Sequence, residues 1–174
     1  MKNLLPVIAL LSIAVLPACK TTKYTPEKFP VRQIVFGDGG GFAGIETSYT
    51  LLENGQIFKQ VGIEGSFTEL KPIKPKAAKV FFDKVNSLQL FKLDIDKPGN
   101  LYYYLRQVTD HLDSRVNWGA GDYMPPQGLV SVYKELKDLA KDREAAKVKK
   151  SMNAATPGEK KNKEVKAAED STKW

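Results

Sequence analysis

Two stretches of the chain place apolar residues at the three- and four-residue spacing of an amphipathic α-helix. One helix is expected to begin at Pro75, since a proline's missing N–H is harmless in the first turn. The other is expected from about Pro126 to Lys141. The apolar stripes are Ala78, Phe81, Phe82, Val85 and Leu88 in the first helix, and Leu129, Val132, Tyr133, Leu136 and Ala140 in the second.

Runs of β-branched and aromatic residues predict strands along most of the remaining chain. The expected strands are 31–36, 45–52, 57–63, 67–70, 101–108 and 112–118. Asn54-Gly55 separates two of these runs, and this dipeptide is preferred at the centre of a type I′ hairpin turn. Glycine-rich loops are expected at 37–44 and 119–126.

The order of these elements, β-β-β(-β)-α-β-β-α, predicts an α+β fold. Hairpins build antiparallel sheets, and two amphipathic helices need one face of a sheet to cover. We therefore expect a two-layer sandwich, in which an antiparallel sheet of 5–6 strands is covered by two helices. The globular domain is expected to span residues 31–141.

The N-terminus has its own pattern, with Lys2 followed by an apolar run from Leu4 to Ala18. The run is shorter than the roughly 20 residues of a membrane-spanning helix. It ends in Leu16-Pro17-Ala18-Cys19, which resembles the signal of a bacterial lipoprotein. The resemblance implies cleavage after residue 18, lipidation of Cys19, and attachment to a membrane through a lipid anchor. An ordinary signal peptide or an uncleaved anchor is the alternative.

The resemblance also bears on location and domain organisation. It implies a signal peptide at 1–18 and a polar tether at 19–30. Lys20 stands where an Asp favours retention in the inner membrane, so the outer membrane is expected. No acidic residue follows directly after Cys19, which favours the periplasmic face.

The body of the chain resembles a class of small uncharacterised bacterial envelope lipoproteins. The resemblance rests on the glycine-rich run from Phe36 to Phe42, followed by Tyr49-Thr50-Leu51 and Asn54-Gly55. It covers residues 31–139 and implies no catalytic residue.

The net positive charge of the chain is concentrated near its C-terminus. The formal net charge is +7. Residues 141–174 hold ten basic and six acidic residues, whereas residues 19–140 hold 16 and 14. The segment 142–174 is rich in Lys, Glu and Ala and is expected to be largely disordered. The alternative is an arm that touches anionic lipid or peptidoglycan. No nucleic-acid partner is expected.

Few residue sets suit catalysis or metal binding. The single Cys and the single His exclude an internal disulfide and a two-His metal site within this chain. Asp38, Glu46 and Asp122 lie near glycine-rich segments, but they lack the spacing of a calcium loop. His111 lies between Asp110 and Asp113, but a catalytic triad would also need a nucleophile, and the sequence does not place Ser114 or Ser131 near it. No cofactor, metal site or catalytic residue is assigned.

Exposed aromatic residues near the glycine-rich loops are the best candidates for an interaction surface. In the run from Tyr102 to Tyr104, Tyr103 points to one face of its strand and its neighbours to the other. Both loops follow strands that end in an aromatic residue, so they approach each other if the strands end at one edge. The candidate residues are Phe42, Tyr103, Tyr123 and Met124.

These observations favour a lipid-anchored envelope protein with a non-catalytic binding or structural domain. The expected partner is an envelope protein, a glycan or peptidoglycan. The alternatives are an envelope hydrolase that uses His111, and an inhibitor or chaperone-like lipoprotein that acts on an envelope enzyme.

Overall fold

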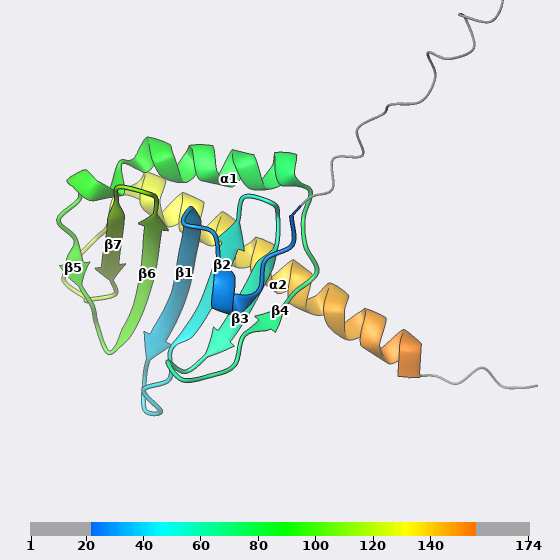
Figure 1. The fold of residues 1–174 in the computed structure, drawn as a ribbon. Helices are drawn as coiled ribbons and strands as arrows, with labels where there is room; N and C mark the ends of the chain where they lie inside the picture. Colours follow the sequence, from blue (N-terminus) through cyan, green and yellow to red (C-terminus); the bar gives the residue numbers. More distant parts are fainter. Residues whose placement is uncertain (1–21, 156–174) are drawn as a thin grey trace, which may run out of the picture.

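The computed structural model describes residues 22–155, in which two helices cover one face of a seven-stranded sheet (Figure 1). The strands are β1 (Gln33–Gly40), β2 (Thr47–Leu52), β3 (Ile57–Val61), β4 (Thr68–Glu69), β5 (Asp96–Lys97), β6 (Leu101–Val108) and β7 (Asp113–Trp118). The helices are α1 (Pro75–Leu88) and α2 (Gln127–Ala155), with 3-10 turns η2 (Pro26–Lys28) and η3 (Leu90–Lys92). The expected α+β fold is confirmed.

The strand order is β4-β3-β2-β1-β6-β7-β5, and every neighbouring pair is antiparallel except β5 and β7. The short strand β5 was not expected, because two residues carry no strand pattern. Strands β1, β3 and β7 run in the same direction, so their C-terminal ends lie at one edge of the sheet. We call this edge the loop edge. The opposite edge, with the β2–β3 and β6–β7 turns, is the hairpin end.

The core lies between the sheet and the helices, as the apolar stripes predicted. Alternate residues such as Ile34 and Phe36 in β1 and Leu51 in β2 are fully buried. The helix residues that pack against them include Ala78, Phe82, Val85, Leu129, Leu136 and Ala140. Periodicity alone therefore placed the buried face of each helix correctly.

The glycine-rich segment was expected to be a loop from residue 37, but β1 continues through it to Gly40. Gly37 lies opposite Tyr104 and Gly39 opposite Tyr102. A Cβ at Gly37 would lie 2.8 Å from the Tyr104 hydroxyl oxygen, and one at Gly39 would lie 2.6 Å from that of Tyr102. Glycine thus makes room in the strand for two tyrosine rings. Positive φ angles begin only at Gly40.

The prediction of a type I′ turn at Asn54-Gly55 is wrong. Such a turn needs positive φ at both central residues, and Gly55 (φ 89°) has it whereas Asn54 does not. The Asn54 side chain instead stabilises the turn, since its Oδ1 accepts a hydrogen bond from the Gln56 N–H at 2.9 Å.

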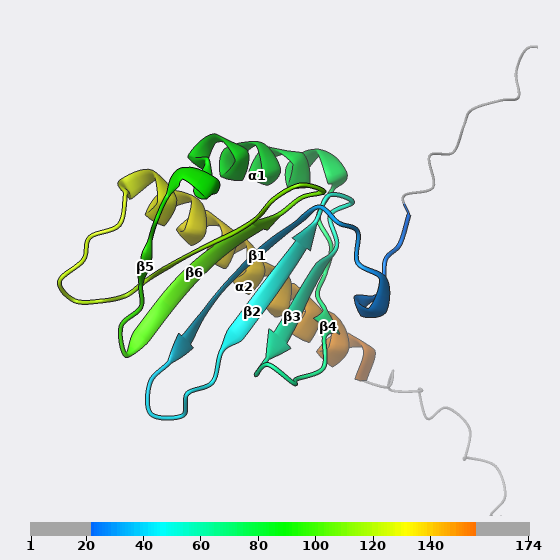
Figure 2. The same cartoon turned by 60° about the vertical axis from the view of Figure 1, so that its left-hand side comes forward.

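The ordered domain begins earlier than residue 31, because residues 22–30 pack on the sheet rather than forming a free tether. The Thr22 carbonyl accepts a hydrogen bond from Asn54 Nδ2 at 2.6 Å. The Phe29 ring lies 4.9 Å from that of Phe58, on the sheet face that the helices leave open. Figure 2 shows this segment beside β3 and β4. The expected signal peptide and Cys19 lie outside the described residues.

Helix α2 does not end near Lys141 but continues to Ala155. Its extension contacts the sheet, since Glu144 accepts a 2.7 Å hydrogen bond from the Tyr49 hydroxyl. Lys147 Nζ donates to the Glu69 carbonyl at 2.9 Å. The expected domain boundary at 141 therefore falls inside a helix. The remainder of the expected disordered tail, residues 156–174, lies outside the described residues.

Candidate interaction surface

Four segments form a continuous row along the loop edge: 41–46, 62–67, 98–101 and 119–126. The Gly62 N–H bonds to the Glu46 carbonyl at 2.7 Å, and the Gly41 N–H bonds to the Asn100 carbonyl at 2.7 Å. Gly99 packs closely on Gly119, and a Cβ atom at Gly99 would collide with the Gly119 carbonyl oxygen. Backbone contacts thus join each segment to the next.

Large apolar side chains are exposed along this row. Phe42, Ile63 and Met124 are almost completely exposed, with relative exposures of 111%, 88% and 91%. Ile45 and Leu101 are more than half exposed. Single exposed apolar residues are common on protein surfaces, but a contiguous series is typical of an interaction surface.

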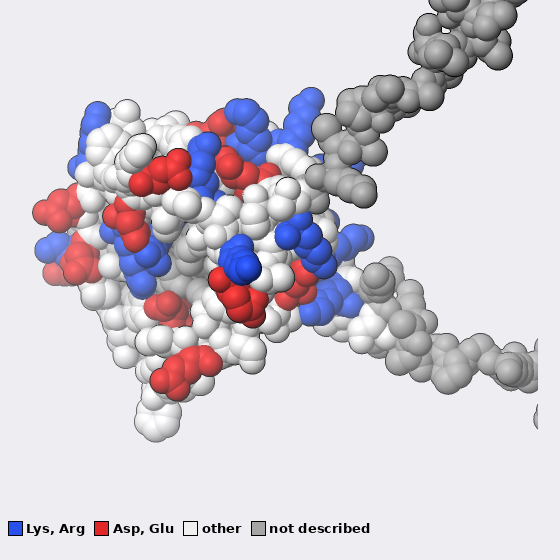
Figure 3. Space-filling view, in the orientation of Figure 1, with Lys and Arg blue, Asp and Glu red and all other residues white. Residues whose placement is uncertain are grey.

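The four segments of the loop edge contain no basic residue, and the nearest lysine in the sequence is Lys97 at the end of β5. They contain three acidic residues, Glu46, Glu64 and Asp122. Figure 3 shows the lower end of the molecule as white and red, without blue. The loop edge is therefore apolar and acidic.

The four residues predicted for this surface fall into two groups. Phe42 and Met124 are exposed, as expected. Tyr103 lies on the helix-covered side and is 39% exposed, with its ring 5.7 Å from that of Tyr133. Tyr123 is partly buried and packs against the core. Only the first two side chains are wholly available to a partner.

The two predicted loops begin at the same edge, as the hypothesis required, with the start of β6 between them. Gly41 and Gly119 approach Leu101 from opposite sides. Figures 1 and 2 show that 41–46 extends beyond the sheet, whereas 119–126 turns back beside β5 towards α2. The loops are thus parts of one row rather than two walls of a pocket.

The open face of the sheet contains a compact polar network above the glycines of β1. The Arg115 guanidinium lies 3.9 Å from the centre of the Tyr104 ring. Glu46 accepts a hydrogen bond from the Tyr102 hydroxyl at 2.8 Å and pairs with Arg115 at 3.3 Å. Burial raises the pKa of Tyr104 above its usual value, and the Glu46 charge adds to this effect.

The acidic residues considered for calcium do not converge. Glu46 is engaged on the open face, whereas Asp38 pairs with Lys137 on the helix-covered face. Asp122 lies in an exposed loop. Within residues 22–155, no group of three His, Cys, Asp or Glu side chains is arranged to hold a metal ion.

One of the two carboxylates that flank His111 in the sequence, that of Asp113, is bound to another residue. Arg106 Nε and Nη2 donate to the Asp113 carboxylate at 2.7 and 2.5 Å. This pairing lowers the pKa of Asp113. His111 is exposed in the β6–β7 turn, at the opposite end of the sheet from the loop edge.

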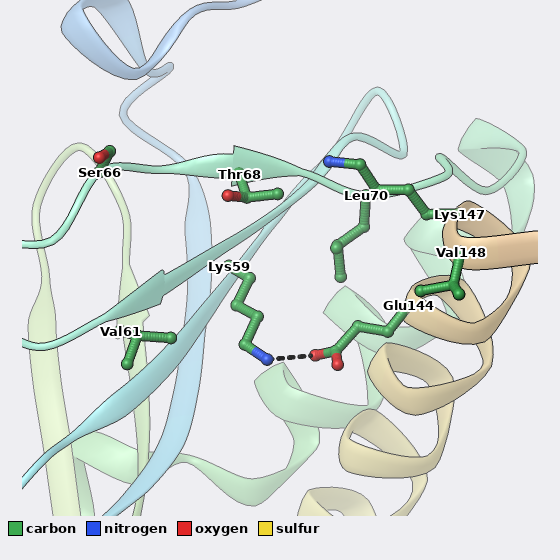
Figure 4. Close-up of a pocket in the computed structure, with 8 residues that line it drawn as sticks. All are labelled: Lys59, Val61, Ser66, Thr68, Leu70, Glu144, Lys147 and Val148. Carbon is green, nitrogen blue, oxygen red and sulfur yellow. Dashed lines mark ion pairs between the residues drawn. The ribbon is translucent and has the colours of Figure 1, made fainter. Parts of the chain in front are cut away.

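The sequence did not reveal a groove between β3, β4 and the extension of α2 (Figure 4). Its volume is about 470 Å³, and Val61, Leu70 and Val148 supply apolar walls. The Lys59–Glu144 ion pair, at 3.1 Å, crosses it. One sequence signal was available: residues 136, 140, 144 and 148 follow a four-residue spacing that continues the inward stripe of α2.

A second groove, of about 460 Å³, lies at the hairpin end. Its lining residues are Arg32, Glu53, Pro75, Lys76, Lys79, Phe82 and Asp83. Arg32 pairs with Glu53 at 3.1 Å, and Lys79 with Asp83 at 2.7 Å. Lys76 is exposed at the start of α1.

Comparisons with models of known protein families and with curated protein sequences find no match for this chain. Among the described residues, no helix is both long and apolar enough to cross a membrane.

Proposed function

We propose that this protein is a lipid-anchored envelope lipoprotein of the outer membrane, held at the periplasmic face through an acylated Cys19. Its domain is a non-catalytic binding module that meets an envelope protein at the loop edge. The observation that carries the anchor is the sequence Leu16-Pro17-Ala18-Cys19, which follows an apolar run and contains the only cysteine of the chain. Two or more acyl chains provide stable attachment to a membrane.

The geometry of the domain supports this arrangement. Thr22, three residues after Cys19, lies at the hairpin end beside Asn54. Strand β1 has eight residues, which correspond to a length of about 26 Å between that end and the loop edge. An anchor at Cys19 would hold the hairpin end near the bilayer and leave the loop edge on the far side.

The chemistry of the loop edge favours a protein partner. Exposed apolar side chains such as Phe42 and Met124 bind best to an apolar surface, and burying them stabilises a complex. Glu64 and Asp122 are exposed and form no ion pair within residues 22–155, so they favour a partner whose apolar surface is bordered by Lys or Arg.

The anchor is tested by substitution of Cys19. Cys19→Ala should abolish incorporation of a radiolabelled fatty acid and leave an uncleaved precursor, because the acylated sulfur is lost. Ser12→Ala, in the same N-terminal segment, is the matched control and should be labelled and processed normally. Labelling of the Cys19→Ala protein at the wild-type level would overturn the proposal.

A further inference from the structure

The part of the hairpin end around the β2–β3 turn carries a basic surface, in contrast to the loop edge and to the β6–β7 turn, where Asp110 and Asp113 lie. Separate segments meet around the β2–β3 turn: Asn54 bonds to Thr22, and the Ile73 N–H bonds to the Gly55 carbonyl at 2.9 Å. The segments 22–24, 30–32, 53–56 and 69–79 contain six basic and two acidic residues, a net charge of +4. The basic residues are Lys23, Arg32, Lys71, Lys74, Lys76 and Lys79.

Several of these charges are available to a ligand. Lys71, Lys74 and Lys76 are exposed and form no ion pair within residues 22–155. Lys76 borders the second groove, which Arg32 and Lys79 also line. Its volume of about 460 Å³ is within the usual range of small-ligand sites.

We propose that the surface around the β2–β3 turn, at the hairpin end, faces a membrane, binds anionic lipid headgroups and so fixes the orientation of the domain. The orientation rests on the proposed anchor, whereas the headgroup binding does not. Cys19 precedes Thr22 by three residues, and three residues of backbone span at most about 11 Å. That limit is close to one Debye length, so the anchor would hold the end of the domain beside the β2–β3 turn within the field of an anionic leaflet.

The headgroup binding is tested on the unacylated chain from residue 19 onward with Cys19→Ser, which contains every described residue. Vesicles of phosphatidylcholine with 30% phosphatidylglycerol are the probe, and co-sedimentation is the measurement. Binding is expected at low salt and should disappear at high salt. The variant Lys71→Glu, Lys74→Glu, Lys76→Glu should bind at least about a hundredfold more weakly, since each surface lysine contributes about fivefold.

A matched variant with the same net charge separates this surface from a general charge effect. It carries Lys97→Glu, Lys134→Glu and Lys141→Glu, three exposed positions in β5 and α2, and should bind much more strongly than the first variant. Equal losses in the two variants, equal binding to pure phosphatidylcholine, or binding to peptidoglycan alone would overturn the inference. So would a loss of binding caused only by deletion of residues 156–174.

The orientation is tested on the acylated protein in the same vesicles. Because acylation occupies the only native cysteine, a nitroxide at Ala77→Cys or Ala43→Cys is a unique probe. The label at residue 77 should contact lipid and the label at residue 43 should remain in water. The reverse result would overturn the orientation. A failure of fatty-acid labelling at Cys19 would instead contradict the anchor, and would leave the vesicle result unaffected.

Discussion

At the scale of single residues, the pairing of Gly37 with Tyr104 shows how the open sheet face is built. The Tyr104 side chain is 1% exposed although neither α1 nor α2 covers that face. It lies between the glycine of β1 and the guanidinium of Arg115, 3.9 Å above its ring. Covering a strand glycine with an aromatic ring of the neighbouring strand protects a position that has no side chain.

Gly37→Ala should therefore destabilise the protein. The new Cβ would collide with the Thr47 carbonyl and lie 2.8 Å from the Tyr104 hydroxyl oxygen. We expect a loss of about 2–3 kcal/mol in the free energy of unfolding, measured by chemical denaturation. Gly121→Ala is the control, since nothing lies within 4 Å of its Cβ position. An equal effect of both substitutions would show that the tyrosine packing is not the cause.

Phe42 and Tyr123, both predicted surface residues, should respond differently to substitution. Phe42→Ser should change the free energy of unfolding by less than about 0.5 kcal/mol, because the ring is fully exposed. Tyr123→Ser should cost about 1–3 kcal/mol, because that ring packs against the core. Chemical denaturation measures both. A large loss for Phe42→Ser would mean that its ring is packed, and would weaken the case for a contact surface.

At the scale of elements, the extension of α2 beyond Lys141 enlarges the folded domain past its predicted boundary. Glu144 joins the extension to β2 and β3. It accepts a hydrogen bond from the Tyr49 hydroxyl at 2.7 Å and forms an ion pair with Lys59 at 3.1 Å. Burial raises the pKa of Tyr49 well above its usual value, and the bond to Glu144 raises it further. The extension is therefore part of the folded domain rather than the start of a free tail.

Two truncations distinguish the extension from the residues that follow it. A chain that ends at Lys141 loses Glu144 and leaves the buried Tyr49 hydroxyl without its partner, which costs about 1–3 kcal/mol. Its melting temperature should fall by roughly 4 °C for each kcal/mol. A chain that ends at Ala155 should melt within a few degrees of the full chain, because residues 156–174 contain few apolar residues. Similar melting of the two truncated chains would contradict a structural role for the extension.

At the scale of the whole molecule, charge is divided between the two ends of the sheet. The segments around the β2–β3 turn, at the hairpin end, have a net charge of +4, and the loop-edge segments have three acidic residues and no basic one. Residues 19–140 as a whole are nearly balanced, with 16 basic and 14 acidic residues. The nearly balanced composition therefore does not reveal the separation of charge. That separation arises because the fold gathers distant segments of the chain at each end.

The sequence by itself determined the features that depend on local pattern. Both helices, their buried stripes, the main strands and the α+β class follow from the spacing of apolar residues, which secondary structure imposes on neighbouring residues. The exposure of Phe42 was also predictable, since glycines surround it in a short loop. The lipid anchor remains a prediction of the same local kind, because it rests on consecutive residues that end at Cys19.

Only the tertiary structure decided the features that depend on distant partners. The glycines of β1 stay in a strand because Tyr102 and Tyr104, far along the chain, cover them. Residues 22–30 are ordered by the β2–β3 turn and by Phe58. The extension of α2 is held by Tyr49, 95 residues before Glu144. Such contacts form between residues that no sequence period relates, so the chain has to fold before they exist.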